Sequence, residues 1–477
     1  MNIQSPLASQ AMIENKTFDE IAVGDSASLT RVTTQQDIDL FAVISGDVNP
    51  AHMDKAYADT DMFHKIIAHG MLGAGLISSV LGTKLPGPGT IYLGQDLRFL
   101  HPVSIGDTIT ATLTVTEKRP EHGDLTLDCR CTNQKGEVVI SGTAHVRAPK
   151  EKVRRPRVEL PDVQLSRHER LRTLLARTAG GEPMLTAVAH PCDANAIGAA
   201  VEAARVGLIT PILVGPKAKI LKAAEDAKVD ISPFRLIDVP HSNAAAAMAV
   251  DLVHKGEAAL LMKGSLHTDE LLHAVLAPEA GLLTKRRLSH VYLMDVPTYP
   301  RPLLVTDAAV NIAPTLEDKR DIVQNAIDLA HVMGIEMPRV AVLSAVETIN
   351  PKLRSTLDAA ALCKMADRGQ ITGGLLDGPL AFDNAISPAA AAEKGIISQV
   401  AGVADILVVP DLESGNMLAK QLIYLAGADA AGVVLGARVP IILTSRADGE
   451  RTRMASCAVA VLIARERAKA AQTAVGV

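Results

Sequence analysis

An acid and an imidazole five residues apart form the first group of residues that could do chemistry. Asp47 and His52 lie in the segment 44–52, where glycine, asparagine and proline favour a turn. A carboxylate and an imidazole at this spacing can hold and activate one water molecule. Asp and Asn are also ordinary turn and cap residues, so the pair alone leaves a purely structural role open.

A possible hydrogen-bond donor follows in His69-Gly70-Met71, seventeen residues after His52. We expect a helix over 71–81 that starts at Gly70. Its residues are apolar or small on nearly every side, which is typical of a helix buried all round. The first N–H groups of a helix have no partner within it, so the Gly70 N–H could bind an oxyanion.

Alternating segments rich in β-branched residues follow this helix. They predict strands over 90–99, 108–116, 125–132 and 138–146. A buried helix wrapped by an antiparallel sheet is the architecture that the pattern implies.

The C-terminal two thirds of the chain follow a different pattern, in which short apolar runs alternate with helical segments rich in Ala, Leu, Glu and Lys. This alternation predicts a parallel or mixed sheet with helices on both faces. Ligands of such sheets bind at the carboxyl ends of the strands. The runs are 186–189, 212–215, 234–239, 258–262, 291–294, 303–305, 340–343, 406–409, 432–435 and 441–443.

Two of these strand ends carry groups suited to an anion. Lys263-Gly264-Ser265 precedes a helix that includes 268–276, which would direct a cation and helix N–H groups at one place. Thr444-Ser445-Arg446-Ala447-Asp448-Gly449 offers a hydroxyl, a carboxylate and a guanidinium that can bind phosphate through two hydrogen bonds. A capped helix with a surface salt bridge is an equal interpretation of either segment alone.

The composition narrows the class of protein. The chain has 477 residues, a net charge of −5, 2% aromatic residues and no Trp, so nothing points to nucleic acid. Its five scattered cysteines are expected to be reduced thiols in a cytoplasmic protein, and no signal peptide or membrane span is predicted. A charged, proline-bearing segment at 149–167 predicts a linker between domains.

Several motifs in the N-terminal third together resemble the MaoC-like (R)-specific enoyl-CoA hydratases, which have the hot-dog fold. The resemblance implies that Asp47 and His52 activate the water added to a trans-2-enoyl-CoA, and that the Gly70 N–H holds the thioester oxygen. Ser78 matches a position near the acyl pocket, although packing explains a small serine on a buried helix equally well. The motifs are Ser45-Gly46-Asp47-x-Asn49-Pro50-x-His52-x-Asp54, His69-Gly70-Met71, Ile91-Tyr92-Leu93-Gly94-Gln95 and Phe99-x-x-Pro102-Val103-x-x-Gly106-Asp107.

A second set of motifs resembles the phosphate acetyl/butyryltransferases. The motifs are Ala308-Ala309-Val310-Asn311-Ile312-Ala313-Pro314-Thr315, Gly373-Gly374-Leu375-Leu376-Asp377-Gly378-Pro379-Leu380-Ala381-Phe382-Asp383-Asn384-Ala385, Val409-Pro410-Asp411-Leu412 and Thr444-Ser445-Arg446-Ala447-Asp448. The resemblance implies a two-subdomain α/β fold of the isocitrate-dehydrogenase type with its site in the cleft. It also implies acyl transfer between coenzyme A and phosphate, with no metal and no covalent enzyme intermediate.

This second resemblance assigns Ser445 and Arg446 to orienting and neutralising the phosphoryl group. Asp448 is the candidate base, as in butyryltransferase-like sequences, whereas the acetyl-preferring branch has its Asp further on, where this chain has 450–453. The identity of the base and the acyl preference therefore stay open. Lys263 and Arg287 are further candidates for phosphate or coenzyme A contacts. Asp377 and Asn384 either line the cleft or form turns.

The sequence therefore predicts an α+β hot-dog domain followed by an α/β domain in one bifunctional acyl-CoA enzyme. The expected division is a tail at 1–16, a hydratase domain at 17–148, a linker at 149–167 and a transacylase domain at 168–477. Acyl-CoA, phosphate and acyl phosphate would be substrates, with no tightly bound cofactor, metal, nucleic acid or membrane, and with a homo-oligomer of two-fold symmetry. Two alternatives stay open: a C-terminal domain that only senses acyl-CoA and oligomerises, or an N-terminal domain that binds acyl-CoA without hydrating it.

Overall fold

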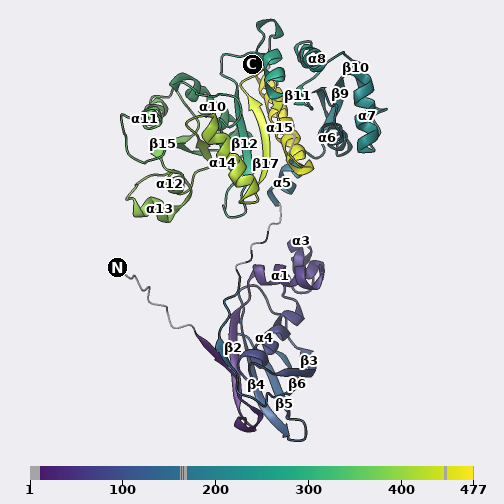
Figure 1. Cartoon of the computed structure of the whole chain (residues 1–477), viewed down its shortest axis with the longest axis vertical. Coiled ribbons are helices and arrows are strands. Elements are labelled where there is room, and N and C mark those ends of the chain that lie inside the picture. The colour runs from purple at the N-terminus through teal and green to yellow at the C-terminus, as the bar shows by residue number, and fades with distance from the viewer. Residues whose placement is uncertain (1–10, 162, 164, 166–168, 445–447, 476–477) are drawn as a thin grey trace. The chain divides into compact units, whose positions relative to one another are not determined.

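The chain divides into two compact units, residues 1–165 and 166–477, within the predicted linker. The structure is a computed structural model that describes residues 11–161, 163, 165, 169–444 and 448–475 (Figure 1). The N-terminal unit contains β1 (Met12–Glu14), η1 (Phe18–Glu20), β2 (Ser26–Val32), α1 (Gln35–Ser45), α2 (Pro50–Met53), α3 (Lys55–Ala58), α4 (Gly70–Thr83), β3 (Ile91–Phe99), β4 (Thr108–Arg119), β5 (Asp124–Thr132), β6 (Val138–Arg147) and β7 (Arg154–Pro156).

The main sheet of this unit is antiparallel and packs against α4. Its five strands have the order β2-β4-β5-β6-β3, and alternate residues of β4 and β5 are buried, as the period of a strand requires. Ile77, Val80 and Leu81 of α4 join Leu113 and Leu127 of the sheet in one core. The predicted hot-dog arrangement, a helix wrapped by an antiparallel sheet, is confirmed.

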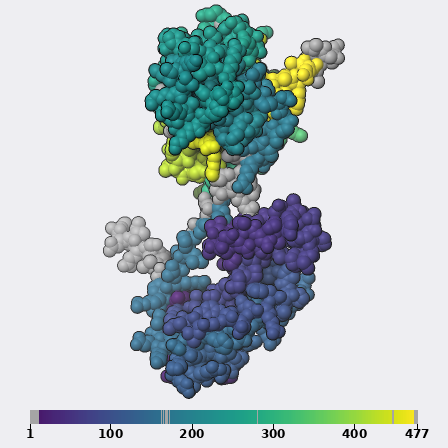
Figure 2. Space-filling model, turned by 90° about the vertical axis from the view of Figure 1, so that its right-hand side faces the viewer, coloured from purple at the N-terminus to yellow at the C-terminus, as the bar shows by residue number. Residues whose placement is uncertain are grey.

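The prediction that α4 is buried all round is wrong for the single chain. Only one side of the helix meets the sheet, whereas Met71 is 57% exposed and Ser78 is also exposed. A continuous apolar surface indicates burial but does not say which partner supplies it. The α1 to α3 segment, in the darkest purple, forms a layer on the surface of this unit (Figure 2).

A two-stranded antiparallel ribbon joins the two ends of the unit. β1 pairs with β7, so that Met12 lies opposite Pro156, although the sequence placed these residues in a tail and a linker. Asn15, which is 1% exposed, fixes the ribbon to the domain. Its Nδ2 donates to the carbonyl oxygens of Pro88 and Glu151, and its Oδ1 accepts from the Val153 N–H.

The C-terminal unit alternates strands and helices along the chain. It contains α5 (Glu169–Thr178), β8 (Met184–Ala189), α6 (Ala194–Arg205), β9 (Ile209–Gly215), α7 (Lys217–Ala227), β10 (Arg235–Asp238), α8 (Ser242–His254), β11 (Leu260–Lys263), α9 (Thr268–Leu276), η2 (Pro278–Ala280), β12 (Ser289–Asp295), β13 (Leu303–Thr306), α10 (Leu316–Val332), β14 (Arg339–Leu343), α11 (Arg354–Asp367), β15 (Leu375–Leu380), α12 (Phe382–Ile386), α13 (Pro388–Glu393), β16 (Ile406–Val408), α14 (Leu412–Tyr424), β17 (Asp429–Leu435), β18 (Ile441–Ile442) and α15 (Glu450–Val475).

The strands of this unit form one mixed sheet, which confirms the predicted α/β class. Among the described residues the order is β10-β9-β8-β11-β18-β17-β12-β13-β16-β14-β15, with antiparallel pairing around β12 and β17 and parallel pairing toward both edges. Adjacent residues of β8 belong to different cores: Val188 packs with α6, α7 and α15, and Ala187 packs with α8 and α9. Helices therefore cover both faces (Figure 1). The edge strand β15 was not predicted.

Two further observations concern the whole of the described chain. All five cysteines are present as thiols without a disulfide. None of the helices in the described part of the chain is both long and apolar enough to span a membrane.

Candidate functional site

The Asp47–His52 turn is held in shape by its own sequence. α1 ends at Gly46, whose φ of 73° is left-handed and suits glycine at a helix C-terminus. The Asn49 side chain caps α2 by accepting from the Ala51 N–H, and Pro50 begins that helix. The carboxylate of Asp47 accepts the Asn49 N–H at 3.1 Å and is 50% exposed.

His52 lies on α2 with one ring nitrogen engaged and the other available. Its Nδ1 lies 2.8 Å from the carbonyl oxygen of Ile67. Because a carbonyl oxygen can only accept, we assign the ring proton to Nδ1. Neutral His52 therefore keeps the lone pair of Nε2, which is what a base acting on water requires.

His69 completes this cluster, although no role beyond preceding Gly70 is predicted for it from the sequence. It is 3% exposed, and its ring centroid lies 4.0 Å from that of His52. Its Nε2 donates to the Asp47 carbonyl oxygen at 3.0 Å and lies 4.0 Å from Asp47 Oδ2. The signal that could have found it is its position as N-cap of α4, where its side chain makes no capping bond.

Asp47, His52 and His69 offer ligand atoms within 4.8 Å of one another. Two imidazoles and one carboxylate form a donor set that transition metals accept in other proteins. The Nε2 of His69, however, is engaged with a backbone carbonyl. The Nδ1 of this ring keeps a lone pair, so the three side chains fit a metal ion as well as acid–base chemistry.

Gly70 is the first residue of α4, as the sequence predicted. A Cβ atom added there would lie 3.0 Å from the Phe99 ring, so glycine keeps the helix start accessible. Ser78 lies eight residues further along α4, about 12 Å away at 1.5 Å per residue. The structure thus brings Asp47 and His52 together but places Ser78 at a distance from Gly70.

In the C-terminal unit, Lys263 ends β11 and is 4% exposed. Its ammonium donates to the carbonyl oxygens of Gly264 and Thr444, each at 3.5 Å. Gly264 is required there, because a Cβ atom would lie 2.5 Å from the Ala189 carbonyl oxygen. Burial of an ammonium group is costly, and buried charged groups of this kind cluster at functional sites.

Thr444 connects Lys263 with the start of α15. Its hydroxyl lies 3.5 Å from Arg453 Nη1, and Arg453 Nε donates to the Asp448 carbonyl oxygen at 3.1 Å. Arg453 is 4% exposed and was not singled out from the sequence. Its signal was a cation in the first turn of a helix that directly follows a candidate phosphate loop. The predicted Ser445 and Arg446 lie outside the described residues.

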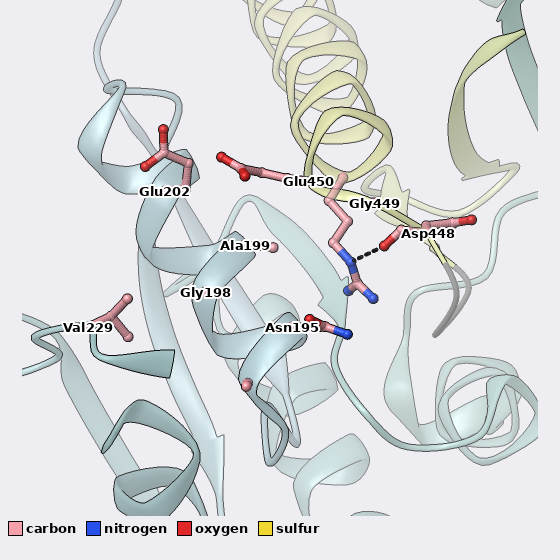
Figure 3. Close-up of a pocket in the computed structure, with 10 residues that line it drawn as sticks. Asn195, Gly198, Ala199, Glu202, Val229, Asp448, Gly449 and Glu450 are labelled. Atoms are coloured by element: carbon pink, nitrogen blue, oxygen red, sulfur yellow. Dashed lines mark hydrogen bonds between the residues drawn. The ribbon is translucent and has the colours of Figure 1, made fainter. Parts of the chain in front are cut away.

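A cavity of about 510 Å³ adjoins Asp448. Asn195, Gly198, Ala199 and Glu202 of α6 form one wall, and the start of α15 forms the other (Figure 3). Its volume falls within the range of small-molecule sites. The predicted candidate base therefore borders a space large enough for a small substrate.

The middle of β12 lies at the same height in the sheet as the ends of β11 and β18. Met262, Ile442, Val433 and Val291 are successive partners across the sheet, so Lys263 lies level with Tyr292. Burial raises the pKa of Tyr292 to about 12, and the nearby Asp448 contributes.

His290, two residues before Tyr292, is fully buried, and burial lowers its pKa to about 3. Gly432 leaves room here, because a Cβ atom would lie 2.7 Å from the Leu443 carbonyl oxygen and 2.9 Å from His290 Nε2.

Arg287 belongs to a different network. Its Nε donates to Asn311 Oδ1 at 2.8 Å, and Asn311 Nδ2 donates to the carboxylate of Asp307. Burial raises the pKa of Asp307. Arg287 comes five residues before Tyr292, which lies opposite Lys263 across the sheet. Along a strand this is a distance of about 16 Å, so the structure does not bring the two cations together.

Asp377 and Asn384 lie further away along the sheet. Three strands separate β15, which carries Asp377, from β12. The Asp377 carboxylate accepts the Gly378 N–H at 2.8 Å, which is a turn-like contact. Asn384 is fully buried, and its amide has no hydrogen-bond partner within the described part of the chain. The role of both residues in binding substrate stays a prediction.

Comparison with known proteins gives two family matches. Residues 241–461 match the family described as phosphate acetyl/butaryl transferase, and residues 21–127 match the MaoC like domain. A phosphate acetyltransferase from Rhizobium meliloti is 62% identical over 311 residues, which cover 65% of this chain and 97% of that protein.

Two solved structures resemble the two units separately. A branched-chain phosphotransacylase from Enterococcus faecalis V583 is 31% identical, with a TM-score of 0.53, over 59% of this chain and 99% of that chain. The R-hydratase PhaJ1 from Pseudomonas aeruginosa is 44% identical, with a TM-score of 0.32, over 33% of this chain and 100% of that chain. The chain therefore belongs to the phosphate acetyl/butaryl transferase family and carries a MaoC-like domain in its N-terminal part.

Proposed function

We propose that the C-terminal unit transfers an acetyl group reversibly between coenzyme A and inorganic phosphate. The observation that carries the proposal is a series of hydrogen bonds that connects Lys263 with Thr444, Thr444 with Arg453, and Arg453 with Asp448. Asp448 and Arg453 line a cavity. The 62% identity to a phosphate acetyltransferase favours acetyl over the branched acyl groups named for the 31% identical structure.

In this reaction the coenzyme A sulfur attacks the carbonyl carbon of acetyl phosphate. A C–S bond forms, the C–O bond to phosphate breaks, and the thiol proton passes to a carboxylate. A thiol with a pKa near ~8.5 is mostly protonated at neutral pH, so a nearby base assists. In this proposal Asp448 takes the proton, and Lys263 and Arg446 offset the charge of the departing phosphate.

The decisive experiment is arsenate- or phosphate-dependent loss of acetyl-, propionyl- and butyryl-CoA, with wild type and Arg446→Ala compared. We expect acetyl-CoA to react fastest and the variant to lose activity. If wild type turns over none of the three thioesters, the C-terminal unit acts as an acyl-CoA sensor and the proposal is wrong.

For the N-terminal unit we propose hydration of a trans-2-enoyl-CoA to the (R)-3-hydroxyacyl-CoA. The supporting observation is that the lone pair of His52 Nε2 and the half-exposed carboxylate of Asp47 belong to one turn beside the start of α4. The water oxygen bonds to C3 while one of its protons passes to this pair, and the pair returns a proton to C2. The Gly70 N–H would stabilise the negative charge on the thioester oxygen.

Loss of the enoyl thioester absorbance of crotonyl-CoA tests this proposal, with Asp47→Ala as the variant. Asp59→Asn is a matched control, because Asp59 is a surface carboxylate paired with Lys55 on the neighbouring helix. We expect hydration to fall at least 10²-fold in Asp47→Ala and to persist in the control. Normal hydration by Asp47→Ala would remove the assignment, and binding of crotonyl-CoA without turnover by wild type would favour a binding domain.

We also propose that the chain forms a homo-oligomer through β3. β3 is an edge strand, and Ile91, Leu93 and Phe99 on it are 54%, 48% and 52% exposed; Met71 of α4 is exposed as well. An uncovered apolar edge strand is an association surface. Sedimentation of Leu93→Glu should give a smaller assembly than wild type, whereas the control Val23→Glu should not.

A further inference from the structure

The two imidazoles of the N-terminal cluster connect two segments of the chain in opposite directions. His52 belongs to the turn and donates from Nδ1 to the carbonyl oxygen of Ile67, two residues before the helix cap. His69 is that cap and donates from Nε2 to the carbonyl oxygen of Asp47 in the turn. Each ring therefore donates to the backbone of the segment that carries the other ring.

The position of the His69 ring is fixed by burial and packing. The residue is 3% exposed and packs between the rings of His52 and Phe41, with centroid distances of 4.0 and 4.9 Å. Its Nδ1 has no hydrogen-bond partner within the described residues, so the ring is held by the bond from Nε2 to the Asp47 carbonyl oxygen. In a buried site this one hydrogen bond fixes the orientation of the imidazole ring, because losing it would leave a second polar atom without a partner.

We infer that His69 is a positioning residue that fixes the distance between the Asp47–His52 pair and the Gly70 N–H. The inference rests on the proposed hydratase function. Hydration needs the base on one side of the substrate and the oxyanion donor on the other, and these belong to different segments. His69 is adjacent to Gly70 in sequence and bonded to Asp47, so it connects the two parts directly. A misplacement of about 1 Å at such a site can reduce the rate about 10²-fold.

Two substitutions separate the hydrogen bond from the packing. His69→Phe keeps a ring between His52 and Phe41 but removes the donor, whereas His69→Gln provides an amide N–H near the position of Nε2. We expect kcat for crotonyl-CoA hydration to fall about 10²-fold in His69→Phe, with KM within about threefold of wild type. His69→Gln should recover at least about tenfold of that loss. The transacylase activity of the same full-length chain serves as the internal control for protein concentration.

A merely structural histidine would lower kcat equally in both variants, in proportion to the folded fraction measured by thermal unfolding. Equal activities of His69→Gln and His69→Phe would therefore overturn the inference, as would a His69→Phe variant within twofold of wild type. If wild type itself does not hydrate crotonyl-CoA, the proposed hydratase function is wrong. This outcome is seen with wild type alone, so it can be told apart from a failure of the inference about His69, which is seen only in the variants.

A second measurement needs no activity. The chain has 14 histidines, and ¹⁵N imidazole spectra of wild type, assigned with His52→Gln and His69→Gln, report which nitrogen carries each proton. We expect the proton of His69 on Nε2 and that of His52 on Nδ1. A His69 proton on Nδ1 would overturn the inference even if His69→Phe does not fold.

Discussion

The ammonium group of Lys263 lies 3.5 Å from the carbonyl oxygen of Thr444, the residue directly before Ser445. The two segments are 181 residues apart in sequence and meet because β11 and β18 are parallel neighbours. A buried cation thus lies beside the residue that precedes Ser445 and Arg446, to which the resemblance to the phosphate acetyl/butyryltransferases assigns the phosphoryl group.

Replacing Lys263 by Met should reduce acetyl transfer by about 10²–10³-fold, because the variant lacks the charge that offsets the phosphate leaving group. Initial rates with acetyl phosphate and coenzyme A measure the effect. Lys255→Met is the control, because Lys255 forms an exposed pair with Asp251, and an equal loss in both variants would contradict the assignment.

Gly70→Pro should abolish hydration more strongly than Gly70→Ala. Proline is favoured in the first turn of a helix and lacks the N–H, and His69 has φ −59° and ψ 134°, the conformation favoured before proline. Both variants add a Cβ atom near Phe99, and proline in addition lacks the N–H and carries two further ring methylenes. We expect crotonyl-CoA hydration by Gly70→Pro to be about 10²–10³-fold slower than by Gly70→Ala. Similar rates in the two variants would exclude the N–H as the oxyanion donor.

His290 should make the C-terminal unit sensitive to acid. Its pKa is lowered from 6.5 to about 3 in the folded state, so between these values the unfolded chain binds more protons and stability falls as pH falls. From pH 7 to pH 5 the loss should be about 2 kcal/mol. Urea unfolding of wild type and His290→Phe at the two pH values measures it, and an unchanged acid sensitivity in the variant would assign the effect to other groups.

Gly264→Ala should destabilise the loop that carries Lys263. The added Cβ atom would lie 2.5 Å from the carbonyl oxygens of Ala189 and His190, and a backbone clash cannot be relieved by a side-chain rotation. We expect a loss of about 2 kcal/mol or more in the free energy of unfolding. Gly198→Ala on α6 is the control, because nothing lies within 4 Å of its Cβ position and alanine favours a helix by about 1 kcal/mol.

The sequence predicted those features that depend on local pattern. β3 and β6 were expected at 90–99 and 138–146 and are found at Ile91–Phe99 and Val138–Arg147, because alternation of apolar residues is visible within one segment. β15 was not predicted, since its Gly378 and Pro379 are typical of turns rather than strands.

Features that depend on distant partners could not be predicted in the same way. The pairing of β1 with β7 joins residues more than a hundred positions apart, and nothing in either short segment identifies the other. The exposure of Met71 depends on how far the sheet extends round α4. His69 and Arg453 were missed as site residues because their roles depend on bonds to Asp47 and Thr444, which only the folded chain creates.

The β1–β7 ribbon also determines how the N-terminal unit would respond to a pulling force. Because Met12 lies opposite Pro156, the chain enters and leaves this unit at the same end of the ribbon, and the Arg157 N–H still donates to the Ala11 carbonyl oxygen there. A pulling force applied between these two points should break the hydrogen bonds of the ribbon one after another. The strands around α4 should come under strain only after the ribbon has opened. The two ends of the unit, Ala11 and Arg157, therefore lie side by side, so that linkers attached to them would start at neighbouring points.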